Sequence, residues 1–255
     1  MLSGKKVAVS GALGGLGLPL LKHLTTLGAQ LIAIDITPTD EASKLLAQNQ
    51  LTNLTYRQMD ITDEEAVNVF AKEQLSTNPP DALVNLAAVV ISGDLITQSK
   101  VNLTRTFEVN VIGQILLTNV FIKSWITNKV AGNIVFTSSW IDHIPWPGVT
   151  PYAASKAAVV SVARGYAREN AKYGIRANLI SPGIVDVGMA AKQWREEPDY
   201  QERAKRAIPL GKLQTPDSVA KGIAFLLSDN STYMSGSNLL IDGGASLYPL
   251  DPEEI

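Results

Sequence analysis

The chain has 255 residues, of which 45% are hydrophobic and 18% are charged, with a net charge of −2 and no cysteine. Length and composition predict a single globular domain over residues 1–255 with a substantial apolar core, and they exclude a disordered chain. The charge provides no basic surface for nucleic acid or an anionic membrane. Disulfides and cysteine-ligated metals are excluded, and two isolated histidines, His23 and His143, predict no metal site.

Short apolar runs alternate with amphipathic segments along the whole chain. The runs predict strands at 6–10, 30–35, 54–59, 82–87, 132–138, 175–181 and 238–242. The amphipathic segments predict helices at 16–27, 41–49, 63–75, 101–128, 154–173 and 216–228. This alternation predicts an α/β, doubly wound Rossmann fold, with one mostly parallel seven-stranded sheet and helices on both faces. Every run except 54–59 is continuously apolar, which predicts strands covered on both faces.

The first run leads into a glycine-rich segment that is typical of a phosphate-binding loop. In "SGALGGLG" (10–17), Gly11, Gly15 and Gly17 follow a strand and precede a helix. Glycines let a pyrophosphate approach the backbone, and the helix start offers free N–H groups. A simple glycine-rich turn is the structural alternative. The strand, loop and helix in succession favour a dinucleotide site.

The same stretch also resembles an export signal, because Lys5 and Lys6 precede an apolar run. The three glycines, and the continuation into a helix and another strand, argue against cleavage. We therefore expect a cytoplasmic protein, and the run is too short to span a bilayer.

An acidic residue ends the second predicted strand. Asp35 follows the glycines by about 20 residues, where a carboxylate can accept hydrogen bonds from the adenosine ribose hydroxyls. The same carboxylate would repel a 2′-phosphate, and neither Gly14 nor Ile36 supplies a positive charge. The sequence therefore predicts NAD rather than NADP as the cofactor.

A tyrosine just before the helix predicted at 154–173 and a lysine in its first turn are expected to lie on one helix face. Tyr152 and Lys156 are four residues apart, so we expect the ammonium to lower the tyrosine pKa and to make the pair a general base. Ser139, at the end of the fifth strand, is a candidate to hold the substrate oxygen, with Ser138 as its local rival.

Taken together, these motifs resemble the short-chain dehydrogenase/reductase family over nearly the whole chain. The resemblance implies hydride transfer between a CH–OH carbon and the nicotinamide cofactor, with a catalytic tetrad of Asn110, Ser139, Tyr152 and Lys156. It implies cofactor contacts from Ser10, Gly11, Gly15, Leu16, Gly17, Asp35, Asp60, Ile61, Asn85, Ala87, Tyr152, Lys156, Pro182, Gly183, Val185 and Val187. The chain departs from the family pattern at Leu86 and Ala88, and at Val187, where threonine is common.

The segment between Ser139 and Tyr152 is similar to that of bacterial glucose 1-dehydrogenases, which share its "IPWP" and the acidic position of Asp142. This similarity predicts a sugar or polyol-like secondary alcohol, although Ile141 stands where those enzymes have histidine. A rigid loop at a subunit contact is the structural alternative for "IPWP". The candidate substrate contacts are Trp140, Asp142, Trp146, Met189 and Trp194.

In the family, the segment corresponding to 184–211 is a mobile lid over the substrate. For Trp194, an exposed face of an amphipathic helix is the alternative. The resemblance also implies a homotetramer or homodimer formed by the long helices near 101–128 and 152–173. We further expect the tail from Leu247 to Ile255 to reach a neighbouring active site.

Three other functions remain open. A reductase of 3-oxoacyl thioesters would want NADPH and a basic patch, and neither is evident. A hydroxysteroid-type substrate would suit Trp140, Trp146 and Met189. A protein that only senses NAD would be expected to lack the catalytic tetrad, which is present here.

Overall fold

The computed structural model describes residues 2–247, apart from the side chain of Met189. Within this range one parallel sheet has the strand order β3-β2-β1-β4-β5-β6-β7. Its strands are β1 (Lys6–Ser10), β2 (Gln30–Asp35), β3 (Leu54–Gln58), β4 (Ala82–Asn85), β5 (Asn133–Thr137), β6 (Arg176–Pro182) and β7 (Asn238–Ile241). The predicted doubly wound α/β fold is confirmed, and each strand lies within its expected run or one residue beyond it.

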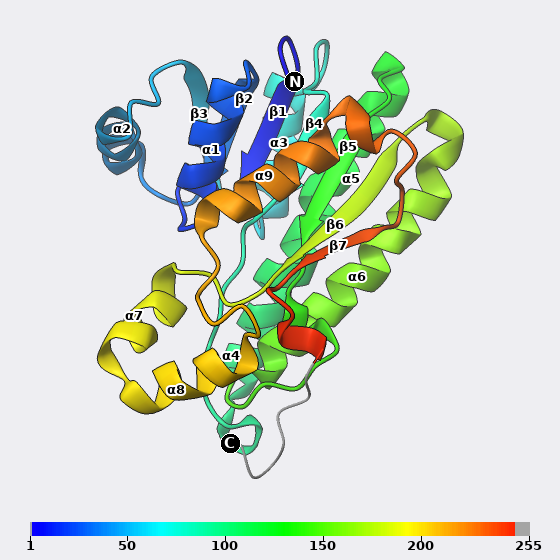
Figure 1. Ribbon diagram of the computed structural model, residues 1–255. Helices are drawn as coiled ribbons and strands as arrows, with labels where there is room; N and C mark the ends of the chain where they lie inside the picture. The colour runs from blue at the N-terminus through cyan, green and yellow to red at the C-terminus, as the bar shows by residue number, and fades with distance from the viewer. Residues whose placement is uncertain (1, 248–255) are drawn as a thin grey trace.

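Helices cover both faces of this sheet (Figure 1). α1 (Gly17–Thr26), α2 (Thr39–Gln48) and α9 (Pro216–Leu227) pack on one face, where Leu20, Leu24 and Ile223 belong to one apolar core. α3 (Glu64–Gln74), α5 (Gln114–Asn128) and α6 (Thr150–Asn170) pack on the other face, where Phe70 and Phe121 are buried. Sheet residues covered in this way must be apolar on both sides, which explains the continuous apolar runs.

Local sequence signals set several helix starts. The Asp63 carboxylate accepts a hydrogen bond from the Ala66 N–H at the start of α3, and Thr215 caps α9 through the Ser218 N–H. Each bond satisfies one of the N–H groups that a helix start leaves unpaired. Pro151 lies in the first turn of α6, where its missing N–H costs nothing.

The helix predicted at 101–128 is interrupted. α4 (Lys100–Phe107) leads into a π-helical turn, Glu108–Gly113, before α5 begins at Gln114. A π turn inserts an extra residue into the helix and is common at functional sites. Here it contains Asn110, whose side chain is fully buried. Apolar periodicity does not reveal such an insertion, because the pattern on either side remains helical.

The seventh strand differs from its prediction. β7 lies at the edge of the sheet, and Leu240 is 41% exposed, so this strand is not covered on both faces in one chain. Its apolar sequence fits the covered strand that was predicted, but its place at the edge leaves only β6 as a neighbour.

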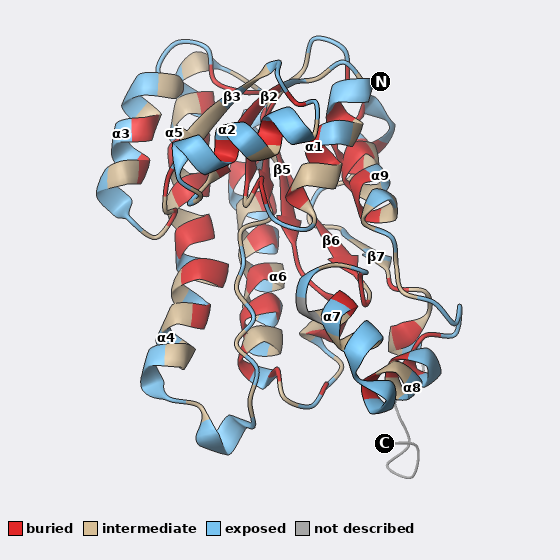
Figure 2. Cartoon of the chain, turned by 90° about the vertical axis from the view of Figure 1, so that its left-hand side faces the viewer, coloured by how far each residue is buried: buried red, intermediate tan, exposed pale blue. Residues whose placement is uncertain are grey.

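The carboxyl ends of the strands face two short helices, α7 (Gly188–Glu196) and α8 (Pro198–Ala207), in the predicted lid segment (Figure 1). A separate apolar cluster, in which Trp140, Trp146 and Tyr200 are buried, joins the lid to the loop after β5. Burial otherwise concentrates along the sheet and the inner faces of its helices (Figure 2). The predicted contact of the C-terminal tail lies outside the residues that the structure describes, which end at Leu247.

One helical stretch, Lys100–Asn128, has the length and apolar composition of a membrane span. Of its apolar window, 56% is buried inside the fold, as expected for a helix that packs against a sheet. The segment with export-signal character forms β1 and α1, and is part of the central core.

Candidate active site

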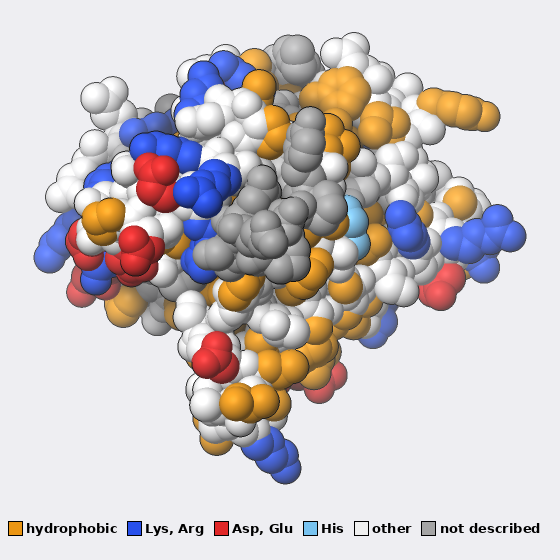
Figure 3. Space-filling model, turned by 60° about the horizontal axis from the view of Figure 1, so that its bottom comes forward, with side chains coloured by type: hydrophobic (Ala, Val, Ile, Leu, Met, Phe, Trp, Pro, Cys, Tyr) orange, Lys and Arg blue, Asp and Glu red, His pale blue; other side chains and the backbone are white. Residues whose placement is uncertain are grey.

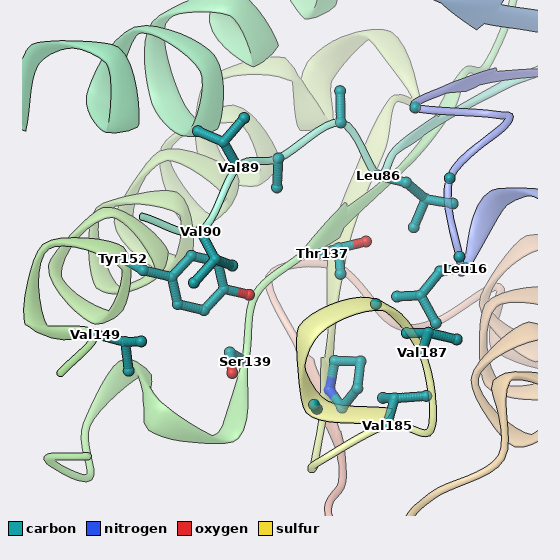
Figure 4. A pocket seen from close by; sticks show the side chains of 18 of the residues that line it. Leu16, Leu86, Val89, Val90, Thr137, Ser139, Val149, Tyr152, Val185 and Val187 are labelled. Atoms are coloured by element: carbon teal, nitrogen blue, oxygen red, sulfur yellow. The ribbon is translucent and has the colours of Figure 1, made fainter. Parts of the chain in front are cut away.

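A cavity of about 800 Å³ opens at the carboxyl ends of the strands. Its walls come from the β1–α1 loop, the segments after β2, β4 and β5, the start of α6, the β6 turn and the lid. In a parallel sheet this edge is where ligands bind. Figure 4 shows Tyr152 and Ser139 facing a space that is also bounded by Val89, Val90 and Val187.

The glycine loop at one end of the cavity requires its glycines for close packing. Gly11 has a φ of +66°, and a Cβ atom there would lie 2.6 Å from the Ala87 backbone nitrogen. A Cβ on Gly17 would lie 2.4 Å from backbone atoms of Ala12, and one on Gly15 would lie 2.8 Å from the Val187 Cβ. The loop is therefore held against the β4 and β6 segments, and its glycines present only backbone to the cavity.

The residues of this loop fit the dinucleotide that the sequence implies. The start of α1 has no acidic side chain in its first turn and no side-chain cap, and Gly14, Gly15, Leu16 and Gly17 line the cavity. N–H groups at a helix start that no side chain caps, together with the dipole, favour a phosphate. The buried Thr137 hydroxyl oxygen, which has no hydrogen-bond partner among the described residues, lies in the same wall.

Asp35 lies at the end of β2 in the position that was expected. One carboxylate oxygen accepts a hydrogen bond from the Leu13 N–H at 2.9 Å, and the other accepts from the Thr37 N–H and hydroxyl at 3.1 and 2.8 Å. These bonds fix the carboxylate in the cavity wall next to Gly14 and Ile36. Neither neighbour carries a positive charge.

Asp60 and Ile61 line the cavity beyond Asp35. Burial acts to raise the pKa of Asp60, but hydrogen bonds from the Thr62 N–H and hydroxyl and the charge of Arg105 outweigh it and hold the pKa below its usual value. The Arg105 guanidinium lies 3.6 Å from the Asp60 carboxylate. Asp60 therefore stays ionised at neutral pH, and much of the charge of Arg105 is balanced.

Tyr152 and Ser139 meet at the centre of the cavity. Tyr152 lies in the first turn of α6, and its phenol ring and the Ser139 side chain face the same space (Figure 4). Burial raises the pKa of Tyr152 to about 12, and the neighbouring Ser139 side chain lowers it only in part. This pKa shift is opposite in direction to the one we expected from the neighbouring lysine. Loss of hydration destabilises the buried phenolate more than its neighbours stabilise it.

Lys156 lies one helical turn beyond Tyr152 and is buried. Its Nζ donates a hydrogen bond to the Thr137 carbonyl at 2.9 Å and lies 5.4 Å from the centre of the Tyr152 ring. Burial lowers the pKa of Lys156 to about 8, so the amine is mainly charged at pH 7. The predicted pair therefore shares one helix face, with the ammonium behind the phenol ring.

The structure separates Ser139 from its local rival. The Ser138 hydroxyl lies 3.1 Å from the Lys156 carbonyl and 2.9 Å from the Asp142 carboxylate, so it is engaged within the fold. Ser139 Oγ accepts a long 3.5 Å bond from the Ile141 N–H, and the residue lines the cavity beside Tyr152. Ser139 is thus the serine whose side chain faces the tyrosine (Figure 4).

Asp142 does not reach the cavity, contrary to its assignment as a substrate contact. Its carboxylate is hydrogen-bonded to the Ser138 hydroxyl and to His143 Nδ1, and its side chain is only 6% exposed. The residue ends the short helical turn Trp140–Asp142, and this turn directs the carboxylate back toward the body of the protein. Trp140, Ile141 and Trp146 line the cavity instead.

Asn110 lies behind the cavity wall, where its side chain makes several hydrogen bonds. Its side chain accepts a hydrogen bond from the Val89 N–H at 2.8 Å and donates to the Val89 carbonyl at 3.0 Å. It also donates to the Ser155 hydroxyl, which in turn donates to the Tyr152 carbonyl. The asparagine therefore joins the wall after β4 to the first turn of α6.

The other predicted cofactor contacts fall into two groups. Ala87, Pro182, Gly183, Val185 and Val187 line the cavity. Ser10 and Asn85 are fully buried, and Asn85 donates to the Thr118 hydroxyl at 3.1 Å, so both lie behind the lining. Gly183 is required because a Cβ there would lie 2.8 Å from the Asp242 Cα.

The predicted lid contacts are placed differently. Trp194 does not line the cavity and packs against the cluster that joins the lid to the loop after β5, with Lys205 over its ring. The structure does not describe the Met189 side chain. Tyr200 and Arg203 of α8 line the cavity, and sequence reasoning did not identify them. Their spacing of three residues places both on one helix face, which is the signal that could have found them.

The wall after β4 was also missed as a substrate-side surface. Val89 and Val90 line the cavity opposite the β6 turn (Figure 4). Both follow the "NLAA" segment, where the sequence indicated only cofactor contacts. Their irregular backbone carries no periodic pattern that would have marked them.

Comparisons with known proteins agree with this geometry. A protein-family model described as enoyl-(acyl carrier protein) reductase matches residues 11–246. The chain is 32% identical to an L-xylulose reductase of Caenorhabditis elegans over 95% of this chain and 96% of that protein. It is 30% identical to 3beta-hydroxysteroid dehydrogenase 1 of Eggerthella lenta, over 97% and 96%. A crystal structure of a candidate NAD(P)-dependent gluconate 5-dehydrogenase from Beutenbergia cavernae, with bound NADP, superposes with a TM-score of 0.89 at 26% identity, over 97% and 98%.

Proposed function

Since this chain belongs to the short-chain dehydrogenase/reductase family, an enzyme family that acts on CH–OH groups, we propose that it is an NAD-dependent dehydrogenase of a sugar or polyol-like secondary alcohol. The observation that carries the proposal is the Tyr152–Ser139 pair, which faces the same cavity as the uncapped glycine loop. A cofactor and a small substrate can meet only where these two features share one space.

The residues divide the chemistry among them. NAD, when bound, accepts the hydride that leaves the alcohol carbon. Ser139 holds the substrate oxygen beside the Tyr152 hydroxyl, and the tyrosine oxygen receives the proton of the alcohol during oxidation or returns it to the carbonyl during reduction. Lys156 favours the phenolate through its charge. Apolar walls exclude water from the transfer, including Val89, Val90 and Trp140.

The preference for NAD rests on Asp35. Its carboxylate is fixed by the Leu13 and Thr37 hydrogen bonds, where it would accept bonds from ribose hydroxyls and repel a 2′-phosphate. The arginines that line the cavity lie elsewhere: Arg105 pairs with Asp60, and Arg203 lies against Trp146. The Beutenbergia cavernae structure contains NADP, so cofactor choice is the first point to test.

The sugar substrate has support apart from Asp142. The relatives include proteins named for xylulose and gluconate, and the cavity carries Ser92, Asp94 and Gln193 among its polar lining. A hydroxysteroid-type alcohol is the second candidate, because Trp140, Trp146 and Tyr200 form an aromatic wall and one relative is named for that activity.

The test is a substrate panel with both cofactors. Aldoses, polyols, sugar acids and ring alcohols are incubated with NAD or NADP, and the absorbance of the reduced cofactor is followed. We expect turnover of a polyhydroxylated alcohol with at least tenfold preference for NAD, and loss of that turnover in Tyr152→Phe. Preference for NADP would contradict the role of Asp35, and exclusive use of ring alcohols would favour the second candidate.

A further inference from the structure

Arg203 projects from the lid helix α8 into the wall of the cavity. Its guanidinium lies over two aromatic rings, 5.0 Å from the centre of the Trp146 ring and 5.6 Å from that of Tyr200. Trp146 in turn packs edge-on against Trp140, which directly follows Ser139. Arg203 is therefore connected by aromatic contacts to the part of the cavity that holds Ser139 and Tyr152.

The charge of Arg203 has no acidic partner among residues 2–247. Its Nε is buried and has no hydrogen-bond partner among the described residues. A buried N–H of a charged group without a partner costs free energy unless a ligand satisfies it. Asp94 is an acid in the same cavity lining, and no ion pair within 4.0 Å joins it to Arg203 in the described part of the chain.

Other basic groups of the lid are compensated. Arg195 pairs with Asp186, Lys192 with Glu196, and Lys205 with Glu202. Blue and red side chains are accordingly mixed on the left of Figure 3, where the lid lies. Arg105, the other arginine of the cavity, lies 3.6 Å from Asp60. Arg203 thus differs from its neighbours in facing the cavity with its charge unpaired.

We propose that Arg203 binds an anionic group of the substrate, so that the enzyme acts on a hydroxy acid, such as an acidic sugar derivative, in preference to the neutral alcohol. This inference rests on the proposed dehydrogenase function and narrows its substrate class. A guanidinium stacked on aromatic rings keeps its N–H edges free, and its planar fork matches a carboxylate in two parallel hydrogen bonds. Sulfonates and phosphates share the oxygen geometry, and the test separates them.

A structural role is the competing explanation. The arginine could serve only to clamp α8 onto the loop after β5 through its contacts with Trp146 and Tyr200. In that case its removal would loosen the lid for every substrate. An anion-binding role predicts instead a loss that depends on the charge of the substrate.

The experiment compares matched pairs of substrates, each an acid and its neutral counterpart, such as gluconate with glucitol and galacturonate with galactose. Sulfonated and phosphorylated sugars form two further arms. For the wild type we expect kcat/KM to be at least tenfold higher for the acid of a pair, mainly through KM. In Arg203→Gln this preference should fall about 10- to 100-fold, while the neutral alcohol changes less than about threefold.

Two further variants separate charge from shape. Lys205→Gln removes one positive charge from the same helix outside the cavity lining, and should leave the acid preference unchanged. Arg203→Lys keeps the charge without the planar fork, and should retain part of the preference for a carboxylate. Thermal unfolding of each variant shows whether the substitution in the lid has altered the stability of the fold.

Several outcomes would overturn the inference. Equal losses for acid and neutral substrates in Arg203→Gln would assign the residue a structural role. A wild type that oxidises only neutral alcohols would refute the anionic substrate and leave the proposed dehydrogenase intact. If no alcohol in any arm is oxidised with either cofactor, the proposed function fails. Calorimetry with gluconate then decides the inference separately: binding abolished by Arg203→Gln supports it, and no binding contradicts it.

Discussion

Tyr152, the proposed proton-transfer group, has its pKa raised to about 12 by burial. At neutral pH the hydroxyl therefore keeps its proton, which suits donation to a carbonyl oxygen. Oxidation requires the same oxygen to accept a proton, so its phenolate must form first. The two directions of one reaction should consequently respond differently to pH.

We expect kcat/KM for alcohol oxidation to increase with pH between 6 and 10, as more of the tyrosine ionises. The increase should become shallower above about pH 8, where Lys156 loses the charge that supports the phenolate. Reduction of the matching carbonyl should be flat or decrease over the same range. Initial rates in both directions across a buffer series test this, and an oxidation rate independent of pH would contradict it.

Lys156 also makes a prediction about stability. Burial lowers its pKa from 10.5 to about 8, so this amine binds its proton more weakly in the folded chain than in the unfolded chain. Between pH 8 and 10.5 the unfolded state binds more protons, and the stability of the wild type from this group increases with pH. Below pH 8 the amine is protonated in both states, and the destabilisation caused by burying its charge is fully present.

Lys156→Met should therefore stabilise the free enzyme at pH 7 by up to about 3 kcal/mol while abolishing turnover. The gain should shrink between pH 8 and 10.5. Chemical denaturation without cofactor at pH 7 and pH 10 measures it, and Lys72→Met, an exposed lysine of α3, provides the control. A destabilised variant at pH 7 would show that the hydrogen bond to the Thr137 carbonyl outweighs the cost of burial.

Among the secondary-structure elements, the turn between β1 and α1 depends on the absence of side chains. Gly17 begins α1 with backbone atoms of Ala12 only 2.4 Å from the position of an added Cβ. In the same loop, an added Cβ on Gly14 would contact the Gly11 carbonyl oxygen at 3.4 Å, which is an ordinary contact distance. The two glycines therefore have different structural roles.

Gly17→Ala should destabilise the protein by about 1 to 3 kcal/mol, because the helix must move away from the strand. Gly14→Ala should leave stability within about 0.5 kcal/mol, because it makes no close contact. Unfolding midpoints of the two variants, measured by circular dichroism, provide the comparison. Equal midpoints would mean that the loop relaxes around a methyl group at either position.

The π turn and the lid show how elements place side chains that periodicity alone cannot place. The extra residue in Glu108–Gly113 accompanies a buried Asn110 that is bonded to both polar backbone groups of Val89. In α8, Tyr200 and Arg203 face the cavity, whereas Trp194 of α7 packs inside the lid. A helix pattern predicts which residues share a face, but not which neighbour that face meets.

For the assembly as a whole, the apolar surface of a single chain is informative. Val101, Phe107 and Ile112 are exposed along α4 and the π turn, and Leu240 is exposed on the edge strand β7. Large contiguous apolar surfaces mark contacts between chains, so these residues are where we expect the predicted homotetramer or homodimer to form its contacts. The sequence named the long helices near 101–128 and 152–173 for this role.

Ile112→Lys should shift the protein from its oligomer toward the monomer in sedimentation velocity, because a charge would be buried in the contact. Val69→Lys on α3, at a position exposed to a similar degree, should not change the sedimentation coefficient. A wild type that sediments as a monomer at micromolar concentration would refute the assembly.

Much of the fold followed from local chemistry. Apolar runs of strand length, alternating with amphipathic segments, are sufficient to specify a parallel sheet covered on both faces. Asp63 and Thr215 cap the starts of α3 and α9, and such capping depends only on adjacent residues. The glycine loop, Asp35 and the Tyr152–Lys156 spacing could likewise be recognised, because each motif fixes its function within a few residues.

The tertiary structure decided what depends on distant neighbours. It turned Asp142 toward Ser138 and His143, raised the pKa of Tyr152 by burial, and placed β7 at an edge. It also brought Arg203 over Trp146, across 57 positions in sequence. The amino-acid sequence by itself determined the fold and indicated the candidate catalytic residues, since both rest on short-range patterns. The substrate-binding wall is made of side chains from separate loops, whose orientation only packing determines.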